Sequence, residues 1–358
     1  MAELSEDAVG VRPVGSGLSA LLRWVRPTFE YAPGARPALD IGYFANVVPV
    51  GPNLGVAIST DGVGTKILIA QQAGRFDTVG IDCVAMNVND VVCVGARPLA
   101  LVDYIAVEEA SPALLGPLGE GLARGCAEAG VSCPGGELAQ VRELLHPSAD
   151  GRAFDLVGTA IGTVPLDAIL TGDSVRNGDV LLGLPSAGMH SNGYTLARRA
   201  LLGQAGLRLD QHVAELGRTL ADELLEPTRI YVRPVLAVLD AGLPVRALAH
   251  ITGDGLFNLV RTARPVGFDI ETWPDPPAIF TLIQRLGRIG DEEMFRAFNM
   301  GIGFCLVVPA EAADRVCTAL AGAGCPAHVL GRAVDDPERT VRFRPRSLLG
   351  RGGRFTRV

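Results

Sequence analysis

Apolar segments with strand periodicity and apolar segments with helix periodicity alternate along most of this sequence, and this alternation limits the folds open to the chain. In the first half we expect strands at 54–59, 99–107, 131–133 and 154–164, and helices at 78–94 and 114–129. In the second half we expect strands at 180–184, 247–251, 302–308 and 327–330, and helices at 194–202, 227–240, 311–323 and from Leu256 onward. The pattern predicts a mixed fold that contains both α/β and α+β structure.

The length of the chain predicts more than one domain. Its 358 residues exceed the usual size of one domain, and a polar stretch at 171–179 separates two cycles of strands and helices. We expect an irregular N-terminal arm with a short helical pattern at 18–25, and a frayed C-terminal tail. The expected division is an arm at 1–50, an N-terminal domain at 51–170, a C-terminal domain at 171–345 and a tail at 346–358.

Composition and charge exclude several classes of function. No stretch approaches the roughly 20 apolar residues that a membrane-spanning helix needs, and the first residues lack the apolar run of a secretory signal. A cytoplasmic protein with no membrane partner is expected. A net charge of −7 argues against broad nucleic-acid binding. The seven cysteines form no C-x-x-C pair, so buried free thiols are expected.

A glycine-rich turn, Asp61-Gly-Val-Gly-Thr-Lys66, directly follows an apolar strand. Gly62 and Gly64 let backbone N–H groups approach a phosphate closely. Lys66 adds a positive charge beside Thr65, and Asp61 can hold Mg²⁺. The combination indicates a nucleotide site. The spacing is not that of a P-loop, and a simple tight turn is the alternative interpretation.

Lys66 is also the one lysine in the sequence. The chain has 32 lysines and arginines together, which leaves 31 arginines. A compact ammonium can follow a moving phosphoryl group in a way that the planar guanidinium cannot. The position of Lys66 inside a phosphate-type turn therefore suggests a specific need for lysine. The alternative is that codon bias replaced lysine by arginine elsewhere and left Lys66 by chance.

Acidic and amide side chains interrupt the otherwise apolar helix expected at 78–94. At about 100° per residue, Asp82, Met86 and Asn89 share one face, and Asp90 lies close beside it. A buried carboxylate without a partner is costly, and Mg²⁺ bound to ATP would supply one. A helix cap with surface acids is the alternative.

Two further glycine-containing segments are candidates for binding or catalysis. Gly135 and Gly136 bring the Glu137 carboxylate to a turn after a short strand, where a bare hairpin turn is an equal interpretation. The segment 186–194 lies between a strand and a helix and can present N–H groups to a phosphate. His190 in this segment offers a donor or a proton-transfer group, with a purely structural histidine as the alternative.

Six segments in this order resemble the motifs of the phosphoribosylformylglycinamidine cyclo-ligase family: 61–66, 80–90, 135–137, 190–193, 226–231 and 298–303. The resemblance runs from about Leu54 to about Gly331. It implies a two-domain aminoimidazole ribonucleotide synthetase-like fold whose N-terminal strands pair across a homodimer. It also implies ATP-dependent ring closure of formylglycinamidine ribonucleotide to aminoimidazole ribonucleotide, through a phosphorylated amide.

The resemblance further implies ATP and Mg²⁺ as cofactors and a small phosphorylated substrate. It assigns Mg²⁺ to Asp61, Asp82 and Asp90, and nucleotide contacts to these residues and to Gly62, Gly64, Thr65, Lys66, Asn89, Gly135 and Gly136. It assigns catalysis to Lys66, His190 and Glu137, with Lys66 on the transferring phosphate. It assigns substrate binding to Gly188, His190, Ser191, Asn192, Gly193, Thr252 and Gly253.

Three segments depart from the family pattern. The run 138–142 lacks the hydroxyl and second carboxylate of the family, the segment 9–13 lacks the acids of the family's N-terminal stretch, and Asp254 stands where the family has glycine. Asp254 is expected either to repel a phosphate or to act as a helix N-cap. Two other functions therefore stay open: a paralogue that activates a different amide or carboxylate, and a non-catalytic nucleotide-binding scaffold.

Overall fold

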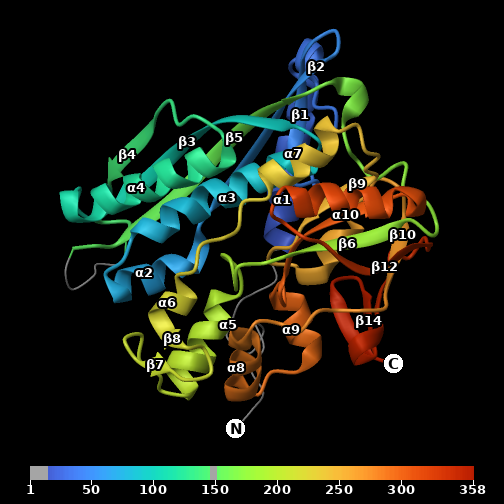
Figure 1. The fold of residues 1–358 in the computed structure, drawn as a ribbon. Helices are drawn as coiled ribbons and strands as arrows, with labels where there is room; N and C mark the ends of the chain where they lie inside the picture. The colour runs from blue at the N-terminus through green and yellow to red at the C-terminus, as the bar shows by residue number, and fades with distance from the viewer. Residues whose placement is uncertain (1–14, 146–150) are drawn as a thin grey trace.

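The computed structural model describes residues 15–145 and 151–358, and each half of the chain builds its own β-sheet (Figure 1). The first sheet has the order β1-β2-β5-β3-β4, and the second has the order β15-β14-β13-β10-β12-β6-β11-β9. The divergent segment 9–13 lies outside the described residues. No helix in the described part of the chain is long and apolar enough to span a membrane.

The first sheet comprises β1 (Asn46–Gly51), β2 (Leu54–Gly62), β3 (Arg97–Val107), β4 (Gly136–Gln140) and β5 (Phe154–Val164). Buried and more exposed residues alternate along β2 and β5, as expected for a sheet with one covered face. Helices α3 (Asp77–Cys93) and α4 (Pro112–Ala129) cover that face. The helix α2 (Ile67–Ala73) follows the turn at the end of β2.

Helices α3 and α4 lie unusually close to each other because glycines meet at their contact. A Cβ atom on Gly121 would lie 2.0 Å from the Asp77 carbonyl oxygen, and one on Gly80 would lie 2.5 Å from the Leu122 nitrogen. Close approach buries α3 completely from Thr78 to Cys93. On its other side α3 contacts β9 and α7 of the second half, so this helix lies between the two sheets.

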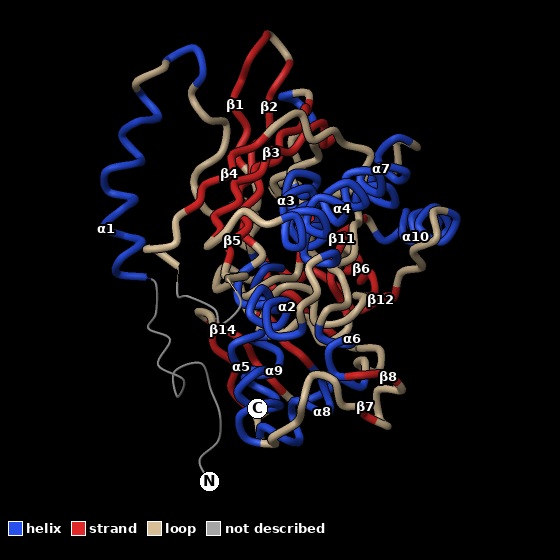
Figure 2. Tube along the Cα trace, turned by 90° about the vertical axis from the view of Figure 1, so that its left-hand side faces the viewer, coloured by secondary structure: helices blue, strands red, loops and turns tan. Residues whose placement is uncertain are grey.

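The opposite face of the first sheet is apolar and exposed. Ile58, Val102, Tyr104 and Ile161 point from three neighbouring strands, each with about two fifths of its surface exposed. The helix α1 (Gly15–Val25) stands on this side of the sheet, away from α3 and α4 (Figure 2). This face is therefore open in the single chain.

The second sheet consists mainly of antiparallel pairs around fully buried strands. Its strands are β6 (Val180–Pro185), β9 (Ala247–His250), β10 (Val266–Ile270), β11 (Ile302–Val308), β12 (His328–Asp335), β13 (Val341–Phe343), β14 (Leu348–Arg351) and β15 (Arg354–Arg357). Its helices are α5 (Tyr194–Arg198), α6 (Leu220–Leu224), α7 (Val232–Asp240), α8 (Ala278–Gly287), α9 (Asp291–Ala297) and α10 (Ala313–Gly322). A short hairpin pairs β7 (His212–Val213) with β8 (Arg218–Thr219).

Most of the long periodic segments were predicted correctly, and the errors lie where the periodicity is short or interrupted. The segment 131–133 makes only a single bridge, between Ala100 and Ser132, and the expected turn at 135–137 instead runs into strand β4. The helix expected at 194–202 changes after Arg198 to a wider π-helical turn, Arg199–Gln204. The helix expected at 227–240 begins only at Val232, and the one expected from Leu256 is a 3₁₀ segment, Gly255–Val260.

The C-terminal tail was expected to be frayed, and this expectation is wrong. Strands β14 and β15 form a hairpin that extends the second sheet, with Gly352 and Gly353 at φ angles of 56° and 80° in the turn. Leu348 and Phe355 are buried on the inner side of this hairpin. The glycine pair between two alternating segments is a hairpin pattern that the high arginine content obscured. Strands β1, β10 and β13 and helices α6, α8 and α9 were also not predicted.

Candidate functional site

The main candidate site is a cavity of about 610 Å³ between the start of the first sheet and the loop that follows β9. Its walls come from the segment before β1, from β2, from α3, and from the loops at 192 and 252–254. The polar lining residues are Asp40, Tyr43, Asn46, Ser59, Thr60, Asp61, Asp90, Asn192, Thr252, Asp254 and Arg261. The cavity therefore joins groups from both halves of the chain.

Two of the three aspartates expected to bind metal face each other across this cavity. Strand β2 presents Asp61, whose backbone N–H donates to Asn87 Oδ1 at 2.8 Å and whose carbonyl accepts from Asn87 Nδ2 at 3.0 Å. Helix α3 presents Asp90, whose Oδ1 lies 2.9 Å from Nδ1 of the buried His250. Both carboxylates are thus held on rigid elements rather than on loops.

The electrostatics of the pair favour a bound cation. Burial, together with the nearby Asp90 carboxylate, raises the pKa of Asp61 from 3.8 to about 6, while His250 and Arg261 oppose this rise. Two carboxylates that repel each other in a cavity fit a hard divalent ion, which would relieve the repulsion and take their oxygens as ligands. Within 15–145 and 151–358, however, no three His, Cys, Asp or Glu side chains are arranged to hold a metal by themselves.

Arg261 supplies the positive charge of the cavity. Among the described residues that line it, Arg261 is the one cation, set against the carboxylates of Asp40, Asp61, Asp90 and Asp254. Its guanidinium Nη2 lies 2.5 Å from Asp254 Oδ2, and its Cζ lies 5.2 Å from the centre of the Phe44 ring. The ion pair and the aromatic ring hold this cation at the edge of the cavity.

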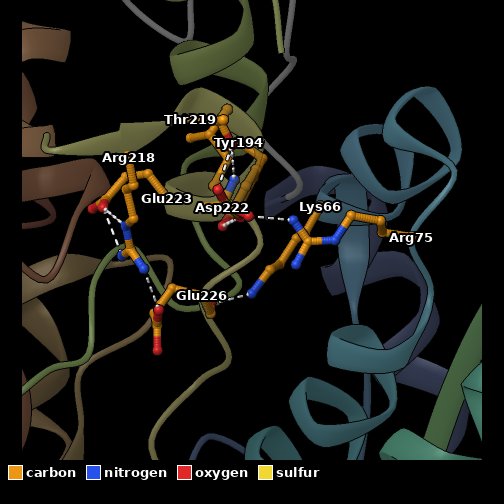
Figure 3. A network of polar contacts seen from close by, with 9 residues as sticks. Lys66, Arg75, Tyr194, Arg218, Thr219, Asp222, Glu223 and Glu226 are labelled. Atoms are coloured by element: carbon orange, nitrogen blue, oxygen red, sulfur yellow. Dashed lines mark hydrogen bonds and ion pairs between the residues drawn. The ribbon is translucent and has the colours of Figure 1, made fainter. Parts of the chain in front are cut away.

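Lys66 and Asp82 form a buried ion pair that does not line the cavity. Lys66 Nζ lies 2.7 Å from Asp82 Oδ2, and both side chains have no exposed surface. The ammonium also donates to the Glu226 carbonyl at 2.6 Å (Figure 3), and Asp82 Oδ1 accepts from the N–H and hydroxyl of Thr228. Burial lowers the pKa of Lys66, and the Asp82 charge opposes this. This arrangement pairs Lys66 and Asp82 with each other and places both outside the lining of the cavity.

Asn89 also connects α3 to the second half of the chain. Its Nδ2 donates to the Arg229 carbonyl at 2.9 Å, and its Oδ1 accepts from the Tyr231 N–H at 2.8 Å. Because α3 is completely buried, its polar side chains must be satisfied by the chain itself. The face that was expected to meet ATP thus fastens the first half to the segment 226–231, and only Asp90 and Met86 of that face reach the cavity.

His190 is buried beneath its loop and does not line the cavity. His190 has a φ of 62°, and its Nε2 accepts from the N–H groups of Ala187 and Arg229 at 3.2 and 3.5 Å. Burial lowers the pKa of His190 well below its ordinary value, with the charges of His250, Lys66 and Arg229 acting in the same direction. A neutral ring that accepts two backbone hydrogen bonds fits a positioning role better than proton transfer.

Some of the remaining predicted residues line the cavity, and the others pack within the loop 188–193 or lie outside the cavity lining. Asn192, Thr252 and Gly253 line the cavity. The Ser191 hydroxyl pairs with that of Thr228, the Gly188 carbonyl accepts from Asn299, and a Cβ on Gly193 would lie 2.3 Å from the Phe298 ring. These residues shape the loop. Gly62, Gly64 and Thr65 are not among the residues that line the cavity.

Glu137 and its glycines lie away from the cavity. Strand register aligns Asp61 with Gly158, Asp103 and Gly136, so Gly136 is three strand spacings from Asp61, or roughly 14 Å. Glu137 is exposed on the edge strand β4, where Gly135 and Gly136 line a separate shallow hollow with it. The structure of the single chain does not bring Glu137 to the two aspartates.

The fold matches a known class of two-domain proteins. A thiamine-monophosphate kinase from Stenotrophomonas maltophilia K279a aligns with a TM-score of 0.59 at 21% identity, over 85% of this chain and 90% of that chain. A hydrogenase maturation protein HypE in complex with ATP aligns with a TM-score of 0.59 at 20% identity, over 82% and 83%. At this identity the likeness defines the fold alone.

The sequence comparisons define the family. Residues 42–164 match the N-terminal domain, and residues 176–344 the C-terminal domain, of the AIR synthase related proteins. The chain belongs to the AIR synthase related protein family. A phosphoribosylformylglycinamidine cyclo-ligase from Methanobrevibacter smithii is 41% identical over 96% of this chain and 97% of its own length. The protein of that name from Methanocaldococcus jannaschii is 45% identical over 83% of each chain.

The raised pKa of Asp61 predicts a pH-dependent cost to stability. Between pH 3.8 and about 6 the folded state retains a proton that the unfolded state loses, so stability falls as pH rises through this window. At pH 7.5, Asp61→Asn should therefore stabilise the ligand-free protein by up to about 3 kcal/mol, and at pH 3.5 the gain should disappear. Urea unfolding at both pH values measures this. Equal effects at the two pH values would contradict the raised pKa of Asp61.

The buried ion pair predicts a large stability effect at Lys66. Lys66→Met leaves the Asp82 carboxylate buried without its cation, which should cost about 3–5 kcal/mol. Adding Asp82→Asn should recover part of this loss. The exposed pair of Arg285 and Glu215 is the control, because Arg285→Met should change stability by less than about 1 kcal/mol. Thermal and urea unfolding compare the variants, and equal effects at Lys66 and Arg285 would contradict the buried pair.

Proposed function

We propose that this chain is an ATP-dependent cyclo-ligase that converts formylglycinamidine ribonucleotide and ATP into aminoimidazole ribonucleotide, ADP and phosphate. The observation that carries the proposal is the 41% identity over nearly the full length of a protein that bears the cyclo-ligase name. The cavity supports it, because carboxylates for a metal and a cation for phosphate converge there from both halves. A reaction between water-soluble nucleotides also fits the expected cytoplasmic location.

In this proposal Asp61 and Asp90 are the residues that would hold Mg²⁺ when ATP is bound. The ion would neutralise phosphate charge during transfer. Asp90 is oriented by His250, and Asp61 is fixed by the two hydrogen bonds between its backbone and Asn87. Fixed ligands of this kind preserve the geometry that in-line transfer requires.

Arg261 takes the role that the sequence suggested for Lys66. A guanidinium binds phosphate oxygens with two parallel donors, and Arg261 already reaches the cavity while Lys66 does not. In the ligand-free chain Asp254 occupies one side of this guanidinium. Asp254 therefore holds the cation in place and competes with the phosphate for it.

The chemistry requires an activated formamide oxygen. That oxygen attacks the terminal phosphorus of ATP, ADP leaves, and the phosphorylated oxygen becomes a good leaving group. The amidine nitrogen then attacks the same carbon, phosphate departs and the ring closes with loss of a proton. Asn192 and Thr252 can bind the amide or the ribose phosphate, since their side chains supply hydrogen-bond donors in the cavity. Arg261 neutralises the charge that develops on the transferring group.

We also propose that two copies associate through the open face of the first sheet. Ile58, Val102, Tyr104 and Ile161 form an apolar surface there, and such surfaces commonly mark protein contacts. Glu137 lies beside Tyr104 in the register of β3 and β4. A second copy on this face would cover Glu137, so any role of Glu137 in metal or proton handling would involve the partner.

The proposed reaction predicts ADP release that depends on formylglycinamidine ribonucleotide. Arg261→Met should lower kcat/KM at least roughly tenfold, about 1.4 kcal/mol in the barrier, while Asp254→Gly should keep or raise it. Arg264→Met is the control, because Arg264 forms an exposed pair with Asp335 outside the cavity. A coupled ADP assay with detection of the aminoimidazole measures all three. ADP release only with another amide would indicate a paralogue, and none with any amide would indicate a scaffold.

The proposed dimer predicts a mass of about twice 37.5 kDa in sedimentation equilibrium. Val102→Arg places a charge in the middle of the apolar face and should shift the protein to the monomer, since an unpaired charge in an interface is costly. Val329 is also an exposed valine but lies on β12, so Val329→Arg should leave the dimer intact. A wild-type monomer at micromolar concentration would contradict the interface.

A further inference from the structure

Helix α2 of the first half lies beside α6 of the second half (Figure 1), and a second groove lies at this junction. It consists of two adjoining hollows of about 740 and 380 Å³, which share Gln72 and Leu202. None of its lining residues lines the main cavity. Pockets at the junction of two domains are common ligand sites, and neither the sequence motifs nor the proposed reaction uses this one.

Arg198 is the unusual residue of this groove. Its Nε atom is buried and has no hydrogen-bond partner, and no carboxylate is paired with its guanidinium in the described residues. Burial lowers the pKa of Arg198, with no compensating charge. By contrast, Arg75 and Arg208, elsewhere in the groove, are paired with Asp222 and Asp210. A bound anion would compensate the charge of this half-buried cation.

Neutral hydrogen-bonding groups and a second arginine line the hollow around this cation. Thr195, Gln72 and Arg199 line the same hollow as Arg198, and the Thr195 hydroxyl lies 3.3 Å from that of Thr65. The chain continues from Arg198 into the π-helical turn Arg199–Gln204, a rare widening of a helix that is frequent at functional sites. The Arg198 guanidinium, the Thr195 hydroxyl and the Gln72 amide together suit an anion with several acceptor oxygens.

The adjoining hollow offers an apolar surface. Leu202, Leu207 and Leu209 line it together with Ala73 and Ala221. Its charged residues Arg75 and Asp222 are already paired with each other, as are Arg208 and Asp210. This part of the groove can therefore take an uncharged organic group. It adjoins the Arg198 hollow directly, because Leu202 and Gln72 line both hollows.

We propose that this groove binds a small phosphate monoester, with its phosphate at Arg198, Thr195 and Gln72 and its organic group over Leu202 and Leu207. Such a ligand would connect the first half of the chain to the second. The contact is close to the buried pair of Lys66, because Thr65 is the neighbour of Lys66 and touches Thr195. A ligand that binds only the folded state would also raise its stability.

The proposal does not depend on the proposed reaction, and calorimetry of the full chain with phenyl phosphate tests it. We expect saturable binding that weakens at least about tenfold in Arg198→Met, which loses the charge-assisted hydrogen bonds. Arg315→Met, an equal loss of charge at an exposed position on α10, should bind as the wild type does. Arg261→Met should also retain binding, since Arg261 belongs to the main cavity.

Two further measurements separate a ligand role of Arg198 from a structural one. Without ligand, Arg198→Met should unfold at the same or a higher temperature, because an uncompensated half-buried charge is removed; a lower temperature would point to a structural role and overturn the proposal. Inorganic phosphate should bind more weakly than phenyl phosphate, and equal affinity would overturn the organic subsite. Unchanged binding in Arg198→Met, loss of binding in Arg261→Met, or equally tight binding of benzoate would each overturn the phosphate site.

Discussion

The polar side chains of helix α3 have to be satisfied inside the protein, and the rest of the structure depends on how this is done. Asn87 binds the backbone of β2, Asn89 binds the segment 226–231, and Asp82 binds Lys66 and Thr228. These partners come from both halves of the chain, so α3 joins the two sheets through directional contacts as well as through apolar packing. Directional contacts fix register and distance, and in this way they place Asp61 opposite Asp90.

The sequence predicted that α3 would need partners, but it did not predict which ones. Periodicity along one helix shows that Asp82, Asn89 and Asp90 share a side, and burial cost then demands a counterpart. Mg²⁺-ATP was the natural candidate when only local sequence was considered. The structure gives these carboxylates protein partners, Thr228 at 146 positions from Asp82 and His250 at 160 positions from Asp90. Contacts of this range leave no trace in the periodicity of a single sequence.

The same limit explains why the cation of the main cavity was not foreseen. Lys66 is distinctive in the sequence because it is the sole lysine, whereas Arg261 is one of 31 arginines and lies outside the glycine-rich motifs. Only folding shows that Arg261 faces Asp61 while Lys66 turns inward. Long strands and helices were predicted well because their patterns are local. The hairpin of β14 and β15 was missed because its short apolar alternation is diluted by arginine.

The strand order of the second sheet has a consequence for how the chain matures in the cell. Strand β12 lies between β6 and β10, so the group of β6, β11 and β9 has no sheet contact with β10 until β12 is in place. β12 spans His328–Asp335 and follows β6, β9, β10 and β11 in the chain. During synthesis the edges of β6 and β10 that β12 covers therefore stay unpaired until β12 has emerged, and unpaired strand edges favour aggregation. Proteolysis before His328 would remove β12 to β15 together and leave β10 without a neighbouring strand.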